Sequence, residues 1–237
     1  MHDLFQSIEA LNDTALESLR LGDLPEGQDY TGEKNFTEAF SDAIQAFVDA
    51  FKVLFGTDGA GENKTEFDET LTEKAAVVMS EVFDKQTISE WGTMSMEQRE
   101  AKLNEYYSEL GNALGIDAKG IVVEDLYATV GEGCQGYNSG DGYLHIDYRN
   151  LQNPETLLEV LNTTTHEARH QLQSEAIEDP SRFPEFSPEL IAEWEHNMIN
   201  YDNGAYGYEG YYNQVIEVDA RVFAAEVINA YRASAGL

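Results

Sequence analysis

Cysteine is almost absent from this 237-residue sequence, in which Cys134 is the only one. A single thiol cannot form a disulfide within the chain, so the fold does not depend on a disulfide framework. This scarcity fits a reducing compartment, and it also fits a bacterial secreted protein that folds without disulfides.

Basic residues are scarce as well. The 14 Lys and Arg residues stand against 45 Asp and Glu residues, which gives a formal net charge of −31 at pH 7. A surface this negative repels other polyanions, which excludes nucleic acid and anionic membranes as partners. The charge favours solubility, for example in a salty environment, and more weakly a preference for basic substrates.

Long apolar runs are missing too. No stretch approaches the roughly 18 consecutive apolar residues of a membrane-spanning helix. Residues 1–20 contain four acidic residues and lack the basic start and apolar centre of a signal peptide. We therefore expect a soluble protein with no membrane span. It would be cytoplasmic, exported by a route without a classical signal peptide, or part of a longer parent protein.

The remaining composition is that of a globular protein, with 42% hydrophobic residues, 13 Tyr and 11 Phe. Apolar residues at helical spacing predict helices over most of the first half. The last of these helices begins at the capping box Ser95-x-x-Gln98 and ends at Gly115. We expect residues 1–115 to be a helical region that packs against residues 116–237. The helices predicted in this region span residues 3–21, 36–55, 65–85 and 96–114.

The second half has a different pattern. Residues 120–126 are rich in β-branched residues, and residues 143–148 alternate between apolar and polar, which predicts a hairpin or a small sheet. His145 belongs to this alternation and is interpreted as a strand residue, not a metal ligand. The predicted fold class is therefore α+β, predominantly helical. Further helices are predicted from residue 154 past 172, over 188–199 and over 213–233.

The stretch Thr163–Gln171 contains the pattern H-E-x-x-H, from His166 to His170. Residues four apart lie on the same face of a helix, so both histidines can direct a ring nitrogen at one Zn²⁺ ion. Glu167 lies beside the first histidine, where it can take a proton from a metal-bound water. A five-residue pattern also occurs by chance. Here, however, it lies within a predicted helix, and a second helix with a carboxylate follows.

A catalytic zinc ion takes three protein ligands and a water, so the pattern needs one more ligand. We expect Glu217, on the helix predicted over 213–233, to supply it. His196 is the main rival, but its acidic and polar neighbours indicate a solvated helix face. Asp219 is a second alternative, either as a ligand in place of Glu217 or as a hydrogen-bond acceptor for a ligand histidine.

His166–Gln171 together with Tyr211–Ala220 resembles the gluzincin metallopeptidases, in particular a small bacterial and phage-associated set. In that set an HEARHxxQ helix is followed by a YxNxxExDA helix, and several members occur in bacterial toxins or effectors. The resemblance covers about residues 120–230 and departs from the N-E-x-x-S-D form of thermolysin-like enzymes. It implies Zn²⁺ as cofactor, Glu217 as third ligand and peptide-bond hydrolysis, with residues 116–237 as a zincin-like metallopeptidase domain.

The implied reaction is hydrolysis of a protein or peptide substrate by a zinc-activated water. Glu167 would be the general base that takes the proton and returns it to the leaving amine. Tyr211 and Tyr212 lie shortly before Glu217 and are candidate donors to the carbonyl oxygen, although either can equally be a packing residue. The predicted strand nearest the active-site helix can bind an extended substrate along its edge.

Two other functions fit the same residues. One is a zinc hydrolase acting on another amide, such as a cell-wall peptide link. The other is a non-catalytic effector or phage interaction protein with a structural zinc, which would be closed by four protein ligands. Arg169 lies off the ligand face, which favours a structural ion pair. The sequence does not indicate the role of Arg221, the substrate or the oligomeric state.

Overall fold

The computed structural model of the chain describes residues 66–131, 133–202 and 208–236. Contacts divide the chain into two units, 1–63 and 64–237, and all described residues belong to the second unit. The helices predicted over 3–21 and 36–55 lie outside the described residues. The boundary expected after residue 115 falls inside the second unit, because helices on its two sides pack against each other.

Among the described residues the fold is mostly helical, with nine α-helices and one small sheet, which confirms the predicted α+β class. None of these helices is both long enough and apolar enough to cross a membrane. The helix predicted over 65–85 is observed as α3, which ends at Val82, and a separate short helix, α4, follows it. In chain order the elements are α3 (Glu66–Val82), α4 (Lys85–Trp91), α5 (Met96–Leu114), β1 (Gly120–Glu124), α6 (Leu126–Thr129), β2 (Gly136–Asn138), β3 (Tyr143–Asp147), α7 (Tyr148–Gln152), the 3₁₀ turn η1 (Pro154–Thr156), α8 (Leu157–Glu178), the 3₁₀ turn η2 (Pro180–Arg182), α9 (Pro188–Ile199), α10 (Tyr208–Tyr212) and α11 (Val215–Ala235).

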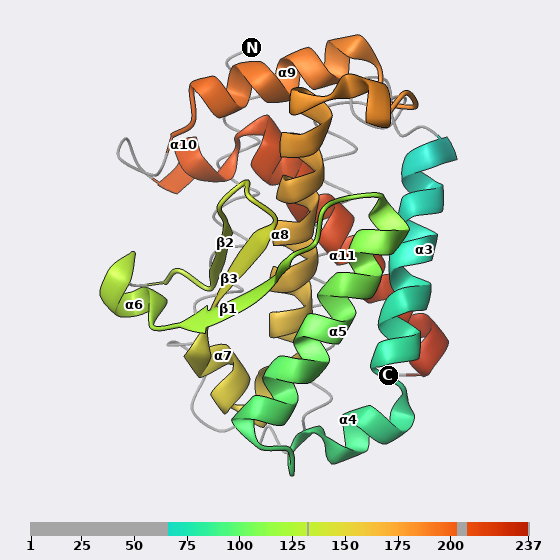
Figure 1. Cartoon of the computed structure of the whole chain (residues 1–237), viewed down its shortest axis with the longest axis vertical. Coiled ribbons are helices and arrows are strands. Elements are labelled where there is room, and N and C mark those ends of the chain that lie inside the picture. Colours follow the sequence, from blue (N-terminus) through green and yellow to red (C-terminus); the bar gives the residue numbers. More distant parts are fainter. Residues whose placement is uncertain (1–65, 132, 203–207, 237) are drawn as a thin grey trace, which may run out of the picture. The chain divides into compact units, whose positions relative to one another are not determined.

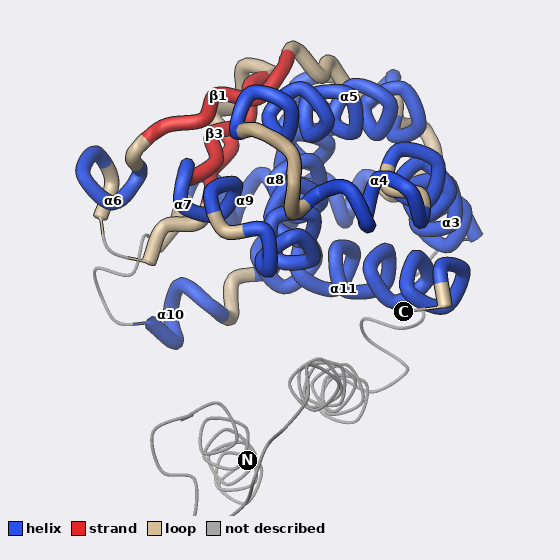
Figure 2. The backbone as a smooth tube through the Cα atoms, turned by 90° about the horizontal axis from the view of Figure 1, so that it is seen from below, coloured by secondary structure: helices blue, strands red, loops and turns tan. Residues whose placement is uncertain are grey.

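Helix α8 lies at the centre of this unit (Figure 1). Helix α11 packs along one side of it, and α5 and the sheet lie on the other side (Figure 2). Apolar side chains recur along α8 at intervals of three or four residues, and Leu161, Ala168 and Leu172 are completely buried. A helix packed on several sides holds its polar side chains in fixed positions.

The sheet has three strands in the order β1–β3–β2. Strands β2 and β3 form an antiparallel hairpin, whereas β1 pairs with β3 in parallel, with Gly120 opposite Tyr143. The two segments in which the sequence predicts strands are therefore neighbours in a small sheet but do not form a hairpin with each other. A parallel pair needs a long connection, and residues 125–142 supply it by forming α6 and β2.

The capping box predicted at Ser95 is confirmed, and a second helix start is capped as well. The Gln98 backbone N–H donates to the Ser95 hydroxyl at 3.3 Å, and the Ser95 N–H donates to the Gln98 side-chain oxygen at 2.8 Å. Ser187 caps α9 by accepting a hydrogen bond from the Leu190 N–H at 3.1 Å. Gly115 ends α5 with a φ of 75°, a left-handed conformation that glycine adopts without strain. Each hydrogen bond at these two helix starts satisfies a backbone N–H group that has no partner within its helix.

Strand β2 packs closely against α8, near the first histidine of the H-E-x-x-H pattern. A Cβ atom added to Gly136 would lie 2.8 Å from Thr163 Cγ2 and 2.9 Å from the His145 carbonyl oxygen, so a larger residue does not fit. Further along the strand, Asn138 Nδ2 donates to Gln171 Oε1 at 3.0 Å. Strand β2 is thereby fixed beside the part of α8 that carries the histidines.

We predict that Gly136→Ala destabilises this unit by about 1–3 kcal/mol, because the added methyl group overpacks the contact between β2 and α8. Both tryptophans of the chain, Trp91 and Trp194, are buried in this unit, so urea unfolding followed by Trp fluorescence reports on it. Gly92→Ala is the matched control, because Gly92 has a φ of −62° and an added Cβ would meet only Pro154 Cβ, at 4.0 Å. Equal losses of stability in both variants would contradict the close packing of β2.

Candidate metal centre

His166 and His170 lie one turn apart on α8 and direct their rings to the same place. Their Nε2 atoms are 3.0 Å apart, and the ring planes are nearly perpendicular, at 86°. The two imidazole side chains are 15% and 13% exposed, so the pair is mostly buried but still reached by solvent. This is the arrangement that the i, i+4 spacing predicts.

Glu217 joins the histidines from the first turn of α11 and is almost completely buried. Its Oε2 atom is 3.4 Å from His166 Nε2, and its Oε1 atom is 3.5 Å from His170 Nε2. Helix α9 fixes the start of α11, because Asn197 Oδ1 accepts a hydrogen bond from the Ile216 backbone N–H at 3.0 Å. A carboxylate in the first turn is also stabilised by the helix dipole. The fold therefore brings the expected carboxylate to the two histidines.

These three side chains can hold a metal ion, since one ligand atom of each lies within 4.8 Å of the others. Ligand atoms about 2.0–2.1 Å from a tetrahedral zinc ion are about 3.3 Å from one another. The distances here are similar, at 3.0, 3.4 and 3.5 Å. Glu217 Oε2 is buried and accepts no hydrogen bond, which leaves it available to a cation. Within the described stretches, no fourth His, Cys, Asp or Glu joins the group.

Gln173 holds the His170 ring in its orientation. Its amide nitrogen donates to the Ile216 carbonyl at 3.1 Å and to Asp219 Oδ2 at 2.6 Å, so the amide oxygen is the end that faces the histidine. That oxygen is 2.8 Å from His170 Nδ1 and can only accept, so Nδ1 carries a hydrogen. In the neutral ring the lone pair therefore lies on Nε2, the atom directed at the other two candidate ligands.

Arg169 extends this network into the core. The residue is 2% exposed and makes two hydrogen bonds to Asp219, at 2.8 Å from Nε and 2.9 Å from Nη2. Nη2 also donates to Asp68 Oδ1, on α3, at 3.1 Å. The structural ion pair expected for Arg169 is confirmed, and Asp219 reaches the nearest histidine only through Gln173. Three aromatic rings have their centroids 5.1–5.4 Å from the guanidinium carbon: Phe186, Trp194 and Phe223.

The charges of the candidate ligands are strongly coupled. Burial alone would raise the pKa of the Glu217 carboxyl, but its interactions with His166 and His170 outweigh burial and hold this pKa well below its usual range. Burial alone would lower the pKa of His170, but hydrogen bonding to Glu217, the charges of Glu167 and Glu217, and the bond to Gln173 raise it to about 9. At neutral pH the group therefore contains a carboxylate and an imidazolium, whose attraction holds the side chains together.

Glu167 follows the first histidine on α8 and is 7% exposed. Burial raises the pKa of Tyr211, and the charges of Glu217 and Glu167 raise it further. The Glu167 backbone carbonyl accepts a hydrogen bond from Asn138 Nδ2 at 3.4 Å, which is a further link to β2. Glu167 is thus next to the candidate ligands without being one of them.

Tyr201, which sequence patterns do not single out, donates a hydrogen bond to Glu217. Its hydroxyl donates to Glu217 Oε1 at 2.8 Å, and burial and the charge of Glu217 both raise its pKa. Tyr211 packs edge-on against Tyr201, with ring centroids 6.2 Å apart. Tyr212 instead lies under Arg221, whose guanidinium carbon is 3.7 Å from the ring centroid. No spacing rule marks Tyr201, because its contact depends on how the end of α9 meets α11.

The other two histidines of the described residues lie outside the group. His196 is exposed on α9 and is not among the candidate ligands. His145 is a strand residue of β3, as predicted, and its Nδ1 atom is 2.6 Å from Glu124 Oε1. Residues 201–212, which are rich in Tyr and Gly, end in helix α10, and their central part, 203–207, lies outside the described residues.

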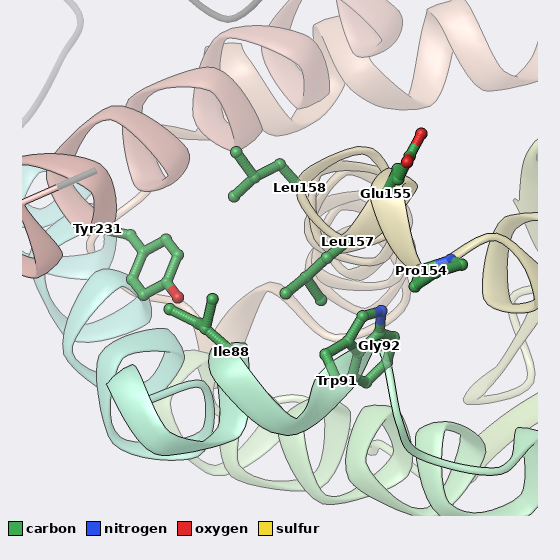
Figure 3. Close-up of a pocket in the computed structure, with 8 residues that line it drawn as sticks. All are labelled: Ile88, Trp91, Gly92, Pro154, Glu155, Leu157, Leu158 and Tyr231. Carbon is green, nitrogen blue, oxygen red and sulfur yellow. The ribbon is translucent and has the colours of Figure 1, made fainter. Parts of the chain in front are cut away.

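A separate hollow of about 390 Å³ lies where α4, η1 and the start of α8 meet α11 (Figure 3). Its walls are mainly apolar, and none of the candidate ligands lines it. The hollow is therefore not part of the candidate metal centre. Its lining residues are Ile88, Trp91, Gly92, Pro154, Glu155, Leu157, Leu158 and Tyr231.

No protein-family model matches this chain, and neither a curated protein nor a solved structure matches it significantly. The resemblance to gluzincins therefore stays a prediction from two motifs. Any function assigned to the site rests on its residues and their geometry.

We predict that Arg169→Ala destabilises the unit by about 3–5 kcal/mol, because it removes the buried counter-charge of Asp219 and Asp68 and leaves a cavity among aromatic rings. Urea unfolding followed by Trp fluorescence, with a metal chelator present, measures the effect. Lys102→Ala is the control, since the ion pair of Lys102 with Glu105 is on the surface and contributes at most about 1 kcal/mol. Similar losses in the two variants would show that the network does not hold the helices together.

Proposed function

We propose that the protein is a zinc-dependent endopeptidase of the gluzincin type. One observation carries the proposal: the Nε2 atoms of His166 and His170 and the Glu217 carboxylate meet at distances of 3.0–3.5 Å, with Glu167 directly after the first histidine. Two imidazoles and one carboxylate suit Zn²⁺, whereas Ca²⁺ and Mg²⁺ prefer oxygen ligands.

Two features support a catalytic zinc over a structural one. A structural site is closed by four protein ligands, and the group found among the described residues has three. The histidine side chains are 15% and 13% exposed, so water and a substrate can approach them. Both features favour the enzyme over an interaction protein that uses zinc only to stabilise its fold.

When bound, zinc supplies Lewis-acid activation of a water molecule and of the substrate carbonyl. Glu167 accepts the proton of that water and passes it to the leaving amine. A hydrogen-bond donor from the protein stabilises the carbonyl oxygen. Of the two expected donors, Tyr212 packs under Arg221, whereas Tyr211 packs against Tyr201, which is hydrogen-bonded to Glu217; this favours Tyr211.

Strand β2 is the proposed binding edge for an extended substrate. Within the described part of the chain it pairs only with β3, so its other edge is unpaired in the sheet. It also packs against α8, beside the histidines. Main-chain hydrogen bonds to an edge strand recognise any extended peptide. This placement favours a protein or peptide over other amides as substrate.

We predict that the purified protein binds one Zn²⁺ per chain, as measured by metal analysis after dialysis. His166→Ala and His170→Ala should each lose most of the metal, and Glu217→Ala should bind it much more weakly, because each variant lacks one of three ligands. His196→Ala is the control and should keep its zinc, because His196 is exposed on α9. Full retention by both histidine variants would exclude the zinc site. A larger loss in His196→Ala than in Glu217→Ala would move the third ligand.

We predict that Glu167→Gln keeps the fold and the zinc content but lowers hydrolysis about 10²–10⁴-fold, because glutamine has the same size but cannot take the proton of the water. Mass spectrometry of a broad library of unfolded proteins and peptides detects cleavage without a prior choice of substrate. If the parent and Glu167→Gln cleave equally, Glu167 is not the general base. If the parent cleaves no member of the library, the non-catalytic alternative is favoured.

A further inference from the structure

We propose that Tyr201 is a positioning residue that restricts Glu217 to one ligand oxygen and so keeps a coordination position open at the metal. The inference rests on the proposed zinc site. It gives a role to a tyrosine that lies outside both the H-E-x-x-H pattern and the helix of the third ligand.

The two oxygens of the Glu217 carboxylate have different surroundings. Oε1 accepts the hydrogen bond from the Tyr201 hydroxyl, at 2.8 Å. Oε2 is buried, accepts no hydrogen bond and lies 3.4 Å from His166 Nε2. A carboxylate oxygen engaged in a charge-assisted hydrogen bond is a weaker donor to a metal than one that accepts none. Oε2 is therefore the ligand atom, and Oε1 is held by the tyrosine.

Arg221 does not compete for the ligand oxygen. Its Nη1 atom is 3.6 Å from Glu217 Oε2, which is too far for a hydrogen bond. Its other terminal nitrogen donates to the Tyr212 carbonyl, and its guanidinium lies over the Tyr212 ring. The cation thus stays near the carboxylate while Oε2 remains available.

Tyr201 is anchored on both sides along the chain. Four residues earlier, the Asn197 side chain accepts a hydrogen bond from the backbone at the start of α11, at 3.0 Å. At the next residue, the Gln214 side chain accepts from the Asp202 N–H at 2.8 Å and donates to the Asp202 carbonyl at 2.9 Å. Both anchors join the end of α9 to the start of α11. The hydroxyl of Tyr201 therefore has a fixed position relative to the carboxylate that α11 carries.

The number of carboxylate oxygens bound to the metal decides whether the site is open. With Oε2 alone, the protein supplies three donor atoms, and one tetrahedral position is left for water or a substrate carbonyl. With both oxygens, the protein would supply four donor atoms, and water or a substrate carbonyl could bind only as a fifth. The hydroxyl of Tyr201 thereby favours a catalytic coordination shell over a closed one.

A competing role for Tyr201 is direct hydrogen bonding to the carbonyl oxygen of the substrate. In that role the hydroxyl would leave Glu217 during the reaction, and its removal would lower the rate without changing the coordination of the resting metal. The coordination number therefore distinguishes the two roles, and its measurement does not require a known substrate.

The test compares the parent chain of 237 residues with Tyr201→Phe, both loaded with Co²⁺, whose visible absorption distinguishes four from five donor atoms. X-ray absorption of the zinc-loaded proteins counts the same atoms. For Tyr201→Phe we expect the weaker bands of a five-coordinate ion and a metal affinity equal to or above that of the parent. Cleavage of library substrates should fall about 10- to 100-fold.

Tyr143→Phe is the matched control, because Tyr143 is 41% exposed against 43% for Tyr201 and lies on β3. It should equal the parent in spectrum, affinity and cleavage. Tyr201→Leu also removes the hydroxyl and should give the same coordination change, which keeps the test valid if the phenylalanine variant folds poorly.

An unchanged cobalt spectrum in both Tyr201 variants would overturn the inference. If the cleavage rate fell while the spectrum stayed unchanged, Tyr201 would be assigned to substrate binding. A large loss of metal affinity would overturn it as well, because Tyr201 would then govern the strength of the ligand and not the number of donor atoms. Failure of the parent to bind Co²⁺ or Zn²⁺ is measured separately, and it would refute the zinc site itself.

Discussion

The buried guanidinium of Arg169 is the contact on which the described structure most depends. A charge that is only 2% exposed requires buried partners of opposite sign. These partners come from two other helices, with Asp219 on α11 and Asp68 on α3. The ion pairs join α3, α8 and α11 at one place. Because α8 and α11 carry the candidate ligands, the same place fixes the separation between the two histidines and Glu217.

A chain of hydrogen bonds leads from that contact to the site. Asp219 accepts from the Gln173 amide nitrogen, and the Gln173 oxygen accepts from His170 Nδ1. This series of hydrogen bonds explains why Asp219, only two positions from Glu217, is not a ligand itself. It faces Arg169 and acts on the histidine through an intervening side chain. The contacts from Asp219 through Gln173 to His170 are typical of residues that orient metal-binding histidines. In a protein of net charge −31, the same network also places the Arg169 cation among acidic groups.

Sequence patterns predict features within one helix better than contacts between elements. The spacing of His166 and His170 fixes their relation on any helix, and the capping box at Ser95 acts over three residues, so both are observed as predicted. Glu217 can be predicted from the sequence because it lies in a motif on a second helix. Tyr201 is one of 13 tyrosines, and only the packing of α9 on α11 distinguishes it. The parallel pairing of β1 with β3 has a similar cause, because the three residues of β2 are too few to show a strand period.

The surroundings of Glu217 Oε2 give the strongest physical reason to expect a cation at this site. A buried polar atom without a hydrogen bond destabilises a fold by about 1–3 kcal/mol. Within the described residues, two buried carboxylate oxygens lack a hydrogen bond. Glu175 Oε2 lies 2.7 Å from Arg182 Nη1, so the fold balances its charge. Glu217 Oε2 has His166 Nε2 at 3.4 Å and Arg221 Nη1 at 3.6 Å; these groups offset its charge but make no hydrogen bond to it. A divalent ion bound by the two imidazoles and this oxygen would give Glu217 Oε2 the partner that the side chains do not supply.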